Sequence, residues 1–238
     1  MRVYFFPKWL IQAVLIGLCV LLAMMVVWSF LAGGEASVMA EPIYQGQTAE
    51  QKVAIAINVD WGEDVLPEML QVLEQSNVKA TFFVTGRFAE KFPELVQQIA
   101  DAGHEIGNHG YKHPHPDQLS VAQNEKDITQ SEAILEKITG AKPTLYAPPY
   151  GEHGQTCLQA AENCGYTTIL WTADTVDWEE PAPSHDTLVQ RVTGDKLTSG
   201  AIILMHPKAH TAEALPDIIG TIKAKGYQCV KVSEVLWV

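Results

Sequence analysis

The sequence predicts an α/β fold, a distorted (β/α) barrel of about seven strands, preceded by one amino-terminal transmembrane helix. Three observations predict it. From Val53 onward, short apolar runs alternate with amphipathic runs of helical length, the pattern of parallel strands joined by helices. About seven such repeats fit into residues 51–238, which suits a small closed or nearly closed barrel better than an open sheet. Before residue 33 the chain has a long uncharged apolar run, which predicts the membrane helix.

The elements of the barrel follow one another in a regular order that starts with a strand. We expect strands at residues 53–58, 81–85, 105–108, 144–147, 167–172, 201–205 and 228–232. We expect helices at about residues 65–76, 88–102, 120–139, 153–164, 185–196 and 212–225. In the third helix, Ser120 and Gln123 form a capping box at the start, and Gly140 marks the end.

The amino-terminal apolar run covers residues 10–32 and contains no charged residue. As a helix it would be roughly 35 Å long, enough to cross a bilayer core of about 30 Å. Arg2 and Lys8 precede the run and Glu35 follows it, so the positive-inside rule puts the amino terminus in the cytoplasm and the rest of the chain outside. A cleaved signal peptide ending at residues 38–40 is the alternative, and it also exports the domain.

These features divide the chain into four parts. Residues 1–9 are a cytoplasmic amino terminus, 10–32 a transmembrane helix or signal anchor, 33–50 a linker of small and polar residues, and 51–238 the folded domain. The predicted localisation is the cell membrane, with the domain outside the cytoplasm, or secretion if the segment is cleaved. The net charge of −12 and the lack of a basic patch argue against nucleic acid as a partner.

Polar and aromatic residues recur at the ends of five predicted strands. His109 and His113 follow the third strand at a spacing that lets two imidazoles close on one metal ion. The other segments are 58–62 after the first strand, 147–151 after the fourth, 174–178 after the fifth, and His206 after the sixth. Because the carboxyl ends of barrel strands meet at one rim, we expect these segments to form one site.

The order and the residues of these segments resemble the motifs of the polysaccharide deacetylases of the NodB-homology type, carbohydrate esterase family 4. The resemblance covers about residues 50–238, and the Trp-Gly ending of the first segment is more similar to the sporulation-associated branch of spore-forming Gram-positive bacteria. The motifs that carry it are His109-x-x-x-His113-Pro114, Pro148-Pro149-Tyr150-Gly151, Asp174-x-x-Asp177-Trp178 and Leu204-x-His206.

The resemblance implies an N-deacetylase that uses a divalent metal ion, expected to be Zn²⁺. Its ligands in this chain would be Asp60, His109 and His113. Asp60 would also act as the general base, and His206 would protonate the departing amine. An acid of the fourth motif would orient and tune His206, and we assign Asp174 to the site, with a loop cap as its alternative interpretation.

The resemblance also implies a polymeric partner. Tyr150 and Trp178 would offer faces on which a sugar stacks, and Pro149 would border the substrate in the same turn as Tyr150. The partners expected on this interpretation are a cell-wall polysaccharide and, through the amino-terminal helix, the membrane.

The first motif departs from the family, which reads Thr-Phe-Asp-Asp-Gly there, with the first aspartate as base and the second as metal ligand. When the two sequences are aligned without a gap from the start of the strand, Asn58 falls at the base position and Val59 at the ligand position. An amide cannot accept the proton, and an isopropyl group cannot bind a metal. Aligned backward from Gly62, Asp60 takes the base position and Trp61 the ligand position. We assign Asp60 as the third ligand, and a solvated turn residue is its alternative interpretation.

A second departure is Ala147, since the family usually has an arginine there that orients the catalytic aspartate. The leading hypothesis remains a membrane-anchored, exported, metal-dependent deacetylase of peptidoglycan-like or chitin-like glycans that acts in sporulation. The alternative is a catalytically impaired domain that binds cell-wall glycan or has a structural role. Hydrolysis of another amide or ester by the same metal is a third option.

Overall fold

The computed structural model describes residues 7–31 and 41–236, and the chain divides into two compact units, Met1–Met39 and Ala40–Val238. The first unit contains helix α1 (Lys8–Leu31), which overlaps the predicted membrane span. Across the described residues, no helix is found that is long and apolar enough to cross a membrane. Residues 1–6 of the predicted cytoplasmic segment and 33–40 of the predicted linker lie outside the described residues.

The second unit is built on one eight-stranded parallel sheet that curls into a half-barrel. Its strands are β1 (Lys52–Val59), β2 (Thr81–Val84), β3 (Glu105–Asn108), β4 (Leu145–Tyr146), β5 (Thr167–Thr168), β6 (Ala173–Asp174), β7 (Ile202–Met205) and β8 (Gln228–Val230). The strand order is β5-β4-β3-β2-β1-β7-β6, and β8 pairs with the first residues of β1 beside β7. The predicted parallel α/β barrel is confirmed as an open one, because the edge strands β5 and β6 do not pair with each other.

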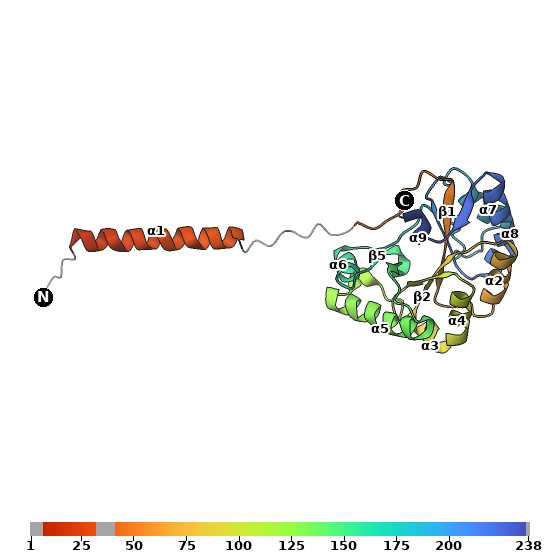
Figure 1. Ribbon diagram of the computed structural model, residues 1–238, viewed down its shortest axis with the longest axis horizontal. Helices are drawn as coiled ribbons and strands as arrows, with labels where there is room; N and C mark the ends of the chain where they lie inside the picture. Colours follow the sequence, from red (N-terminus) through yellow and green to blue (C-terminus); the bar gives the residue numbers. More distant parts are fainter. Residues whose placement is uncertain (1–6, 32–40, 237–238) are drawn as a thin grey trace. The chain divides into compact units, whose positions relative to one another are not determined.

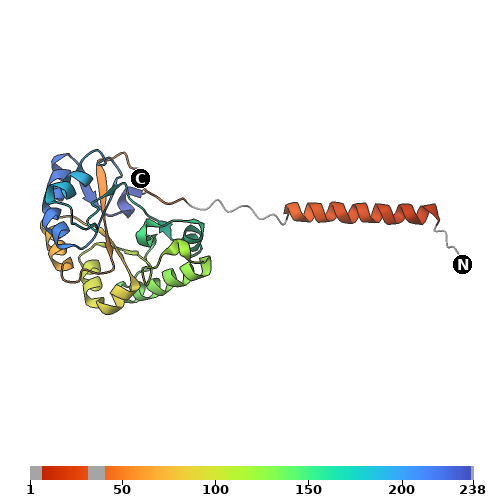
Figure 2. The ribbon, with the colours of Figure 1, turned by 180° about the vertical axis from the view of Figure 1, so that it is seen from behind.

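Helices lie around the outside of this sheet, as Figure 1 and the reverse view in Figure 2 show. They are α2 (Leu66–Gln75), α3 (Gly86–Lys91), α4 (Pro93–Asp101), α5 (Val121–Thr139), α6 (Gln155–Asn163), α7 (His185–Thr193) and α8 (Ala209–Ala224). The short α9 (Ser233–Leu236) instead packs against the interior layer of the core. The helix predicted at 88–102 is two helices, because Pro93 starts a new one. The capping box of Ser120 and Gln123 and the left-handed Gly140 after α5 are confirmed.

The single strand predicted at 167–172 is wrong. The chain pairs with β4 only over β5, then leaves that edge and pairs with β7 over β6. A local apolar run predicts an extended backbone, but it does not predict which neighbouring strand will pair with it. Residues 169–172 therefore run from one edge of the sheet, β5, to the other edge, β6. The gap between these two edges is what keeps the barrel open.

Residues 43–46, which we call the closing segment, bridge that gap. Ile43 pairs with Ile169 near β5, while Gln45 pairs with Ala201 near β7. Gly46 also donates its N–H to the carbonyl oxygen of Gly200 at 2.8 Å. The predicted linker 33–50 is therefore wrong at its carboxyl-terminal end, since residues 43–46 belong to the folded unit.

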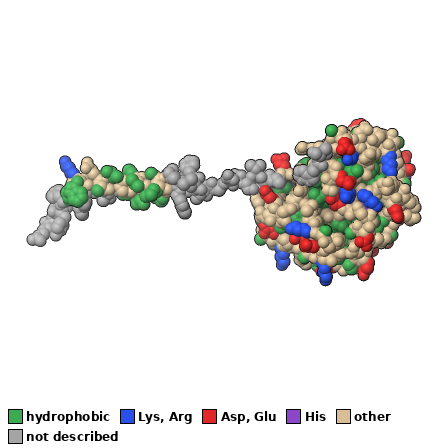
Figure 3. Space-filling model, viewed as in Figure 1, with side chains coloured by type: hydrophobic (Ala, Val, Ile, Leu, Met, Phe, Trp, Pro, Cys, Tyr) green, Lys and Arg blue, Asp and Glu red, His purple; other side chains and the backbone are tan. Residues whose placement is uncertain are grey.

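The hydrophobic core has two layers, because the side chains of β1 alternate between the faces of the sheet. Ile55, Ile57 and Val59 pack outward with α2, α4 and α8, whereas Ala54 and Ala56 face the barrel interior. Leu236 of α9 belongs to the interior layer and helps to fill it. On the surface, acidic and basic side chains are interspersed over the face seen in Figure 3.

Candidate functional site

The predicted functional segments meet in one cleft at the carboxyl ends of the strands. The cleft has a volume of about 350 Å³ and is lined by six predicted residues: His109, His113, Tyr150, Asp174, Trp178 and His206. Five further residues complete the described lining: Asn58, Trp61, Gly151, Trp171 and Leu204. Asp60 and Pro149 are not among the described lining residues, so the structure assembles most of the predicted site.

His109 is a buried, neutral imidazole whose tautomer is fixed by its neighbour. Its Nδ1 lies 2.6 Å from the carbonyl oxygen of Ala147, which can only accept, so Nδ1 carries the proton and Nε2 has a free lone pair. Burial lowers the pKa of His109 to about 3, and the nearby charge of His113 acts in the same direction. The two rings lie 4.9 Å apart between centroids, at 72°.

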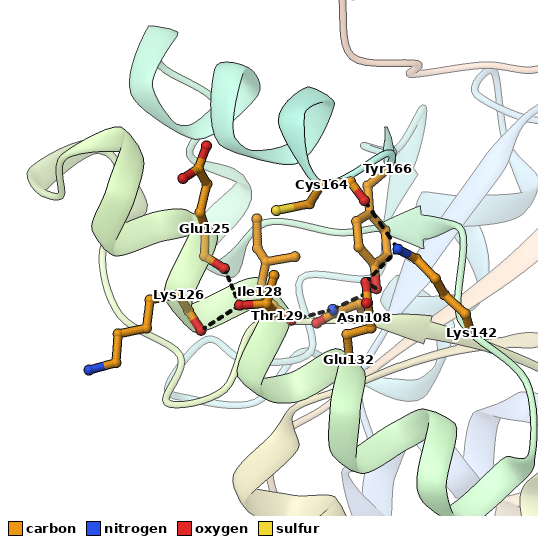
Figure 4. Close-up of polar contacts among 9 residues, drawn as sticks. All are labelled: Asn108, Glu125, Lys126, Ile128, Thr129, Glu132, Lys142, Cys164 and Tyr166. Atoms are coloured by element: carbon orange, nitrogen blue, oxygen red, sulfur yellow. Dashed lines mark hydrogen bonds and ion pairs between the residues drawn. The ribbon is translucent and has the colours of Figure 1, made fainter.

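A buried polar network holds the end of β3 that carries His109. Asn108 donates through Nδ2 to the carbonyl oxygen of Ile128 at 3.0 Å and to the hydroxyl of Tyr166 at 3.1 Å, as Figure 4 shows. Tyr166 donates in turn to Glu132, which pairs with Lys142. Because Asn108 is fully buried, these bonds fix the strand end against α5.

The loop between His109 and His113 is fixed by Asp127 of α5. This carboxylate accepts from the backbone N–H groups of Tyr111 at 2.8 Å and Lys112 at 3.2 Å. His113 itself has a φ of 56°, in the left-handed region that non-glycine residues seldom adopt. Burial lowers the pKa of His113, so both imidazoles favour the neutral form.

His206 is oriented by Asp177 rather than by Asp174, which corrects the prediction. Nδ1 of His206 lies 2.7 Å from Asp177 Oδ1, and the His206 backbone N–H donates to Oδ2 at 2.8 Å. Burial alone would raise the pKa of Asp177, but the bonds from His206 and Thr211 outweigh it and lower the pKa. Asp174 instead accepts from the N–H of Val176, and burial raises its pKa. The motif Asp-x-x-Asp contains both acids, and only the fold decides between them.

Asp60 is engaged by α3. Its Oδ1 accepts from the Thr85 hydroxyl at 2.8 Å and from Arg87 Nε at 2.6 Å, and its Oδ2 accepts from Arg87 Nη2. Burial would raise the pKa of Asp60, but these hydrogen bonds outweigh it and lower the pKa. Sequence reasoning missed Arg87, because nothing in its local pattern links it to a residue so far away along the chain.

Aromatic side chains form much of the cleft wall. Trp178 is 54% exposed and Tyr150 is 58% exposed, so both present a face to a ligand. Tyr150 stacks on His115 with the ring centroids 4.0 Å apart at 10°. Trp171 also lines the cleft and was missed, because it lies in the segment predicted as a plain strand.

Comparison with known proteins decides the family. The model of the family described as polysaccharide deacetylase matches residues 45–169. The chain belongs to the polysaccharide deacetylase family. It is 40% identical over 200 residues to the uncharacterized protein YlxY of Bacillus subtilis, covering 84% of this chain and 62% of that protein. It is 39% identical over 186 residues to a peptidoglycan-N-acetylglucosamine deacetylase of Bacillus cereus, covering 75% of this chain and 66% of that one. The chain thus spans about two thirds of the length of these relatives.

Among solved structures, the chain is similar to a carbohydrate esterase family 4 pseudoenzyme from Bacillus anthracis. The TM-score is 0.79 at 38% identity, and the match covers 83% of this chain and 69% of that one. A mutant of that pseudoenzyme with restored enzymatic activity matches with the same TM-score at 36% identity, over 83% of this chain and 71% of that chain. The family of this deacetylase-like chain therefore includes both active enzymes and a pseudoenzyme.

The strand geometry decides between the two alignments of the family's first motif. Val59 packs in the outward core layer, so it cannot stand at a ligand position in the cleft. Trp61 lines the cleft, and a Cβ on Gly62 would lie 2.5 Å from Cγ of Pro207, so a glycine is required there. The alignment backward from Gly62 fits these facts. Asp60 then stands at the base position and Trp61 at the ligand position.

The residues present do not fit the metal ion of this deacetylase family. Within the described residues, no group of three His, Cys, Asp or Glu side chains could hold a metal ion. The carboxylate of Asp60 is hydrogen bonded to Arg87 and Thr85, and Trp61 offers an indole where the family has a carboxylate. The predicted ligand set of Asp60, His109 and His113 is therefore not assembled.

Proposed function

We propose that this chain is a catalytically impaired member of the polysaccharide deacetylase family, whose cleft binds N-acetylhexosamine units of cell-wall glycan. The observation that carries the proposal is Trp61. It lines the cleft at the position of the missing metal ligand, while its ring lies at 19° to that of His206 with 6.0 Å between centroids. An indole cannot coordinate a divalent ion, but it can pack against the apolar face of a sugar.

The rest of the cleft supports binding of a sugar. Trp171, Trp178 and Tyr150 add aromatic surface on other walls of the same space. His206, fixed by the buried Asp177, adds a polar group of defined orientation to the same cleft. Aromatic walls with a few well-placed polar groups are what carbohydrate and other ligand sites of this size use.

A second candidate function is metal-dependent N-deacetylation of the same glycans, with Zn²⁺ as the ion that the family resemblance implies. The imidazole pair His109 and His113 and the His206–Asp177 pair favour it, because deacetylation by the family requires imidazoles to hold the ion and to protonate the departing amine. In this candidate, Asp60 held by Arg87 would take a proton and His206 would give one to the departing amine. Export, retention at the membrane through residues 10–32 and a role in sporulation are parts of both candidates.

The decisive experiment measures acetate released from N-acetylated peptidoglycan in the presence of zinc. We expect the parent chain to release little or none, and Trp61→Asp to exceed the parent by about tenfold or more, because it supplies the missing ligand. Asn58→Asp is the matched control, since it adds a carboxylate to the same cleft at a residue that the alignment backward from Gly62 places at neither the base nor the ligand position. Turnover by the parent chain as fast as by the Bacillus cereus deacetylase would contradict the impaired reading and favour the second candidate.

Binding is measured separately, by calorimetry with chitotetraose after treatment with a chelator. We expect the parent chain to bind the sugar without metal and Trp178→Ala to weaken that binding. No binding by the parent, in a chain with a normal circular dichroism spectrum, would remove the glycan-binding part of the proposal.

A further inference from the structure

Asn58, near the carboxyl end of β1, places a buried amide at the bottom of the cleft. The residue is 6% exposed and is part of the cleft lining. Because side chains alternate along a strand, Asn58 is on the same face of β1 as Ala54 and Ala56, which face the barrel interior. In the sheet, β1 lies between β2 and β7, so this amide is central in the cleft rather than at its rim.

The side-chain oxygen of Asn58 accepts no hydrogen bond from the part of the protein that the structure describes. The other buried side-chain atoms without a partner among these residues are Ser131 Oγ and Glu162 Oε2, and neither residue lines the cleft. A buried acceptor that lacks a donor costs free energy, and native proteins seldom keep one without a reason. The oxygen of Asn58 is therefore available to a donor that enters the cleft.

A second buried asparagine, Asn108 of β3, shows the contrast with a purely structural role. Its Nδ2 donates to Ile128 and Tyr166, and its Oδ1 accepts from the N–H of Gly110 at 2.9 Å. Both polar atoms of that side chain are thus paired inside the protein. Asn58 differs, because it lines the cleft and its oxygen is unpaired. Holding a strand end in place does not account for it.

The surroundings of Asn58 favour one kind of donor. Leu204 of β7 also lines the cleft, and it pairs in register with Ala56, the preceding residue on the same face of β1. The unpaired acceptor therefore lies beside an apolar side chain. An acetamido group carries an N–H donor close to an apolar methyl group, whereas a sugar hydroxyl brings a donor alone. The pair of Asn58 and Leu204 matches the acetamido group.

We propose that Asn58 is a specificity-determining residue, whose Oδ1 accepts the N–H of the acetamido group of a bound N-acetylhexosamine while the methyl group packs against Leu204. The inference rests on the proposed function, since it requires a cleft that binds such sugars, and it adds the residue that selects acetylated ones. In the alignment backward from Gly62, Asn58 stands where the family's first motif has a threonine. The amide is therefore a feature of this chain and not of the motif.

The test is calorimetry of the full chain, after treatment with a chelator, with chitotetraose and with cellotetraose, which has hydroxyl groups in place of the acetamido groups. We expect the parent to prefer chitotetraose, and Asn58→Leu to bind it about tenfold more weakly because the acceptor is lost. The affinity for cellotetraose should change by less than about threefold, since this sugar brings no acetamido group to Leu204. Asn58→Asp keeps an oxygen acceptor and should keep the preference.

Asn58→Ala is the second variant and should repeat the result of Asn58→Leu without adding volume to the cleft. Both should melt close to the temperature of the parent or above it, because neither loses a hydrogen bond within the protein. Trp178→Ala is the control, since it removes aromatic surface and should weaken binding of both sugars by a similar factor.

Two results would overturn the inference and leave the proposed function standing. One is an unchanged affinity for chitotetraose in folded Asn58→Leu and Asn58→Ala. The other is an equal loss for both sugars in these variants, which would make the partner of Asn58 a hydroxyl instead of an acetamido N–H. Failure of the parent to bind either sugar would instead remove the proposed function, and this inference with it.

Discussion

His104 and His109 flank β3, and burial favours the neutral form of both, but their ring nitrogens have different roles. His109 presents its free nitrogen toward the cleft, while His104, at the start of β3, uses its Nδ1 to accept from the N–H of Ala80 at 3.1 Å. Burial lowers the pKa of His104 to about 4, and Lys79 acts in the same direction. His104 is 7% exposed and its ring packs against that of Phe82 at 5.1 Å between centroids, so protonation would cost both the acceptor and the apolar contact.

This burial predicts that the protein loses stability in mild acid. The pKa of His104 is lower in the folded chain than in the unfolded chain, so the unfolded state binds the extra proton and stability falls as the pH drops from about 7 toward 4. Between pH 7 and pH 5 the parent should lose about 1–2 kcal/mol more of its free energy of unfolding than His104→Gln, which cannot titrate. Urea unfolding at pH 7, 6 and 5 measures this. Parallel pH profiles of the two proteins would contradict it.

The closing segment 43–46 shows how an element with little regular structure completes the half-barrel. Gly46 lies so close to α9 that a Cβ there would be 2.1 Å from the carbonyl oxygen of Val235. On its other side, Gly200 has a φ of 79°, and a Cβ on it would lie 2.1 Å from the carbonyl oxygen of Gly46. Three backbone segments therefore meet at two glycines, and side chains there have no room.

We predict that Gly46→Ala lowers the free energy of unfolding by about 2 kcal/mol or more, because the clash is with backbone that cannot move aside. The melting temperature should fall by about 4 °C or more. Gly220→Ala is the matched control. Its Cβ meets nothing within 4 Å inside α8, so alanine should stabilise the helix by about 0.5–1 kcal/mol. Thermal unfolding of the three proteins measures both effects, and equal melting temperatures for the parent and Gly46→Ala would refute the packing argument.

On the scale of the whole molecule, the chain combines a folded family domain with an apolar amino-terminal segment. The folded unit brings residues from the ends of β1, β3, β4, β6 and β7 into one cleft, which follows from parallel strands sharing one carboxyl edge. The apolar segment belongs to a separate unit of the chain.

We predict that the full chain is recovered in the membrane fraction of cells that express it. Replacing Leu18 and Leu21 by lysine should move it out of that fraction, because each lysine in the middle of the span costs about 2.5–3.5 kcal/mol. Replacing both by isoleucine is the control and should change nothing. Recovery of a shortened chain in the medium, with an amino terminus near Glu41 by mass spectrometry, would instead identify a cleaved signal peptide.

The sequence by itself determined the parallel α/β class, most element positions, the capped helix α5 and the family, because these depend on local periodicity and on motifs read along the chain. It also found six residues of the cleft, since strand ends in a barrel share one rim. Only the tertiary structure decided which acid meets His206, which alignment places Trp61 in the cleft, and that Arg87 holds Asp60. Each of these is a contact between residues distant in the chain or a choice of strand face, and neither is encoded in the spacing of nearby residues.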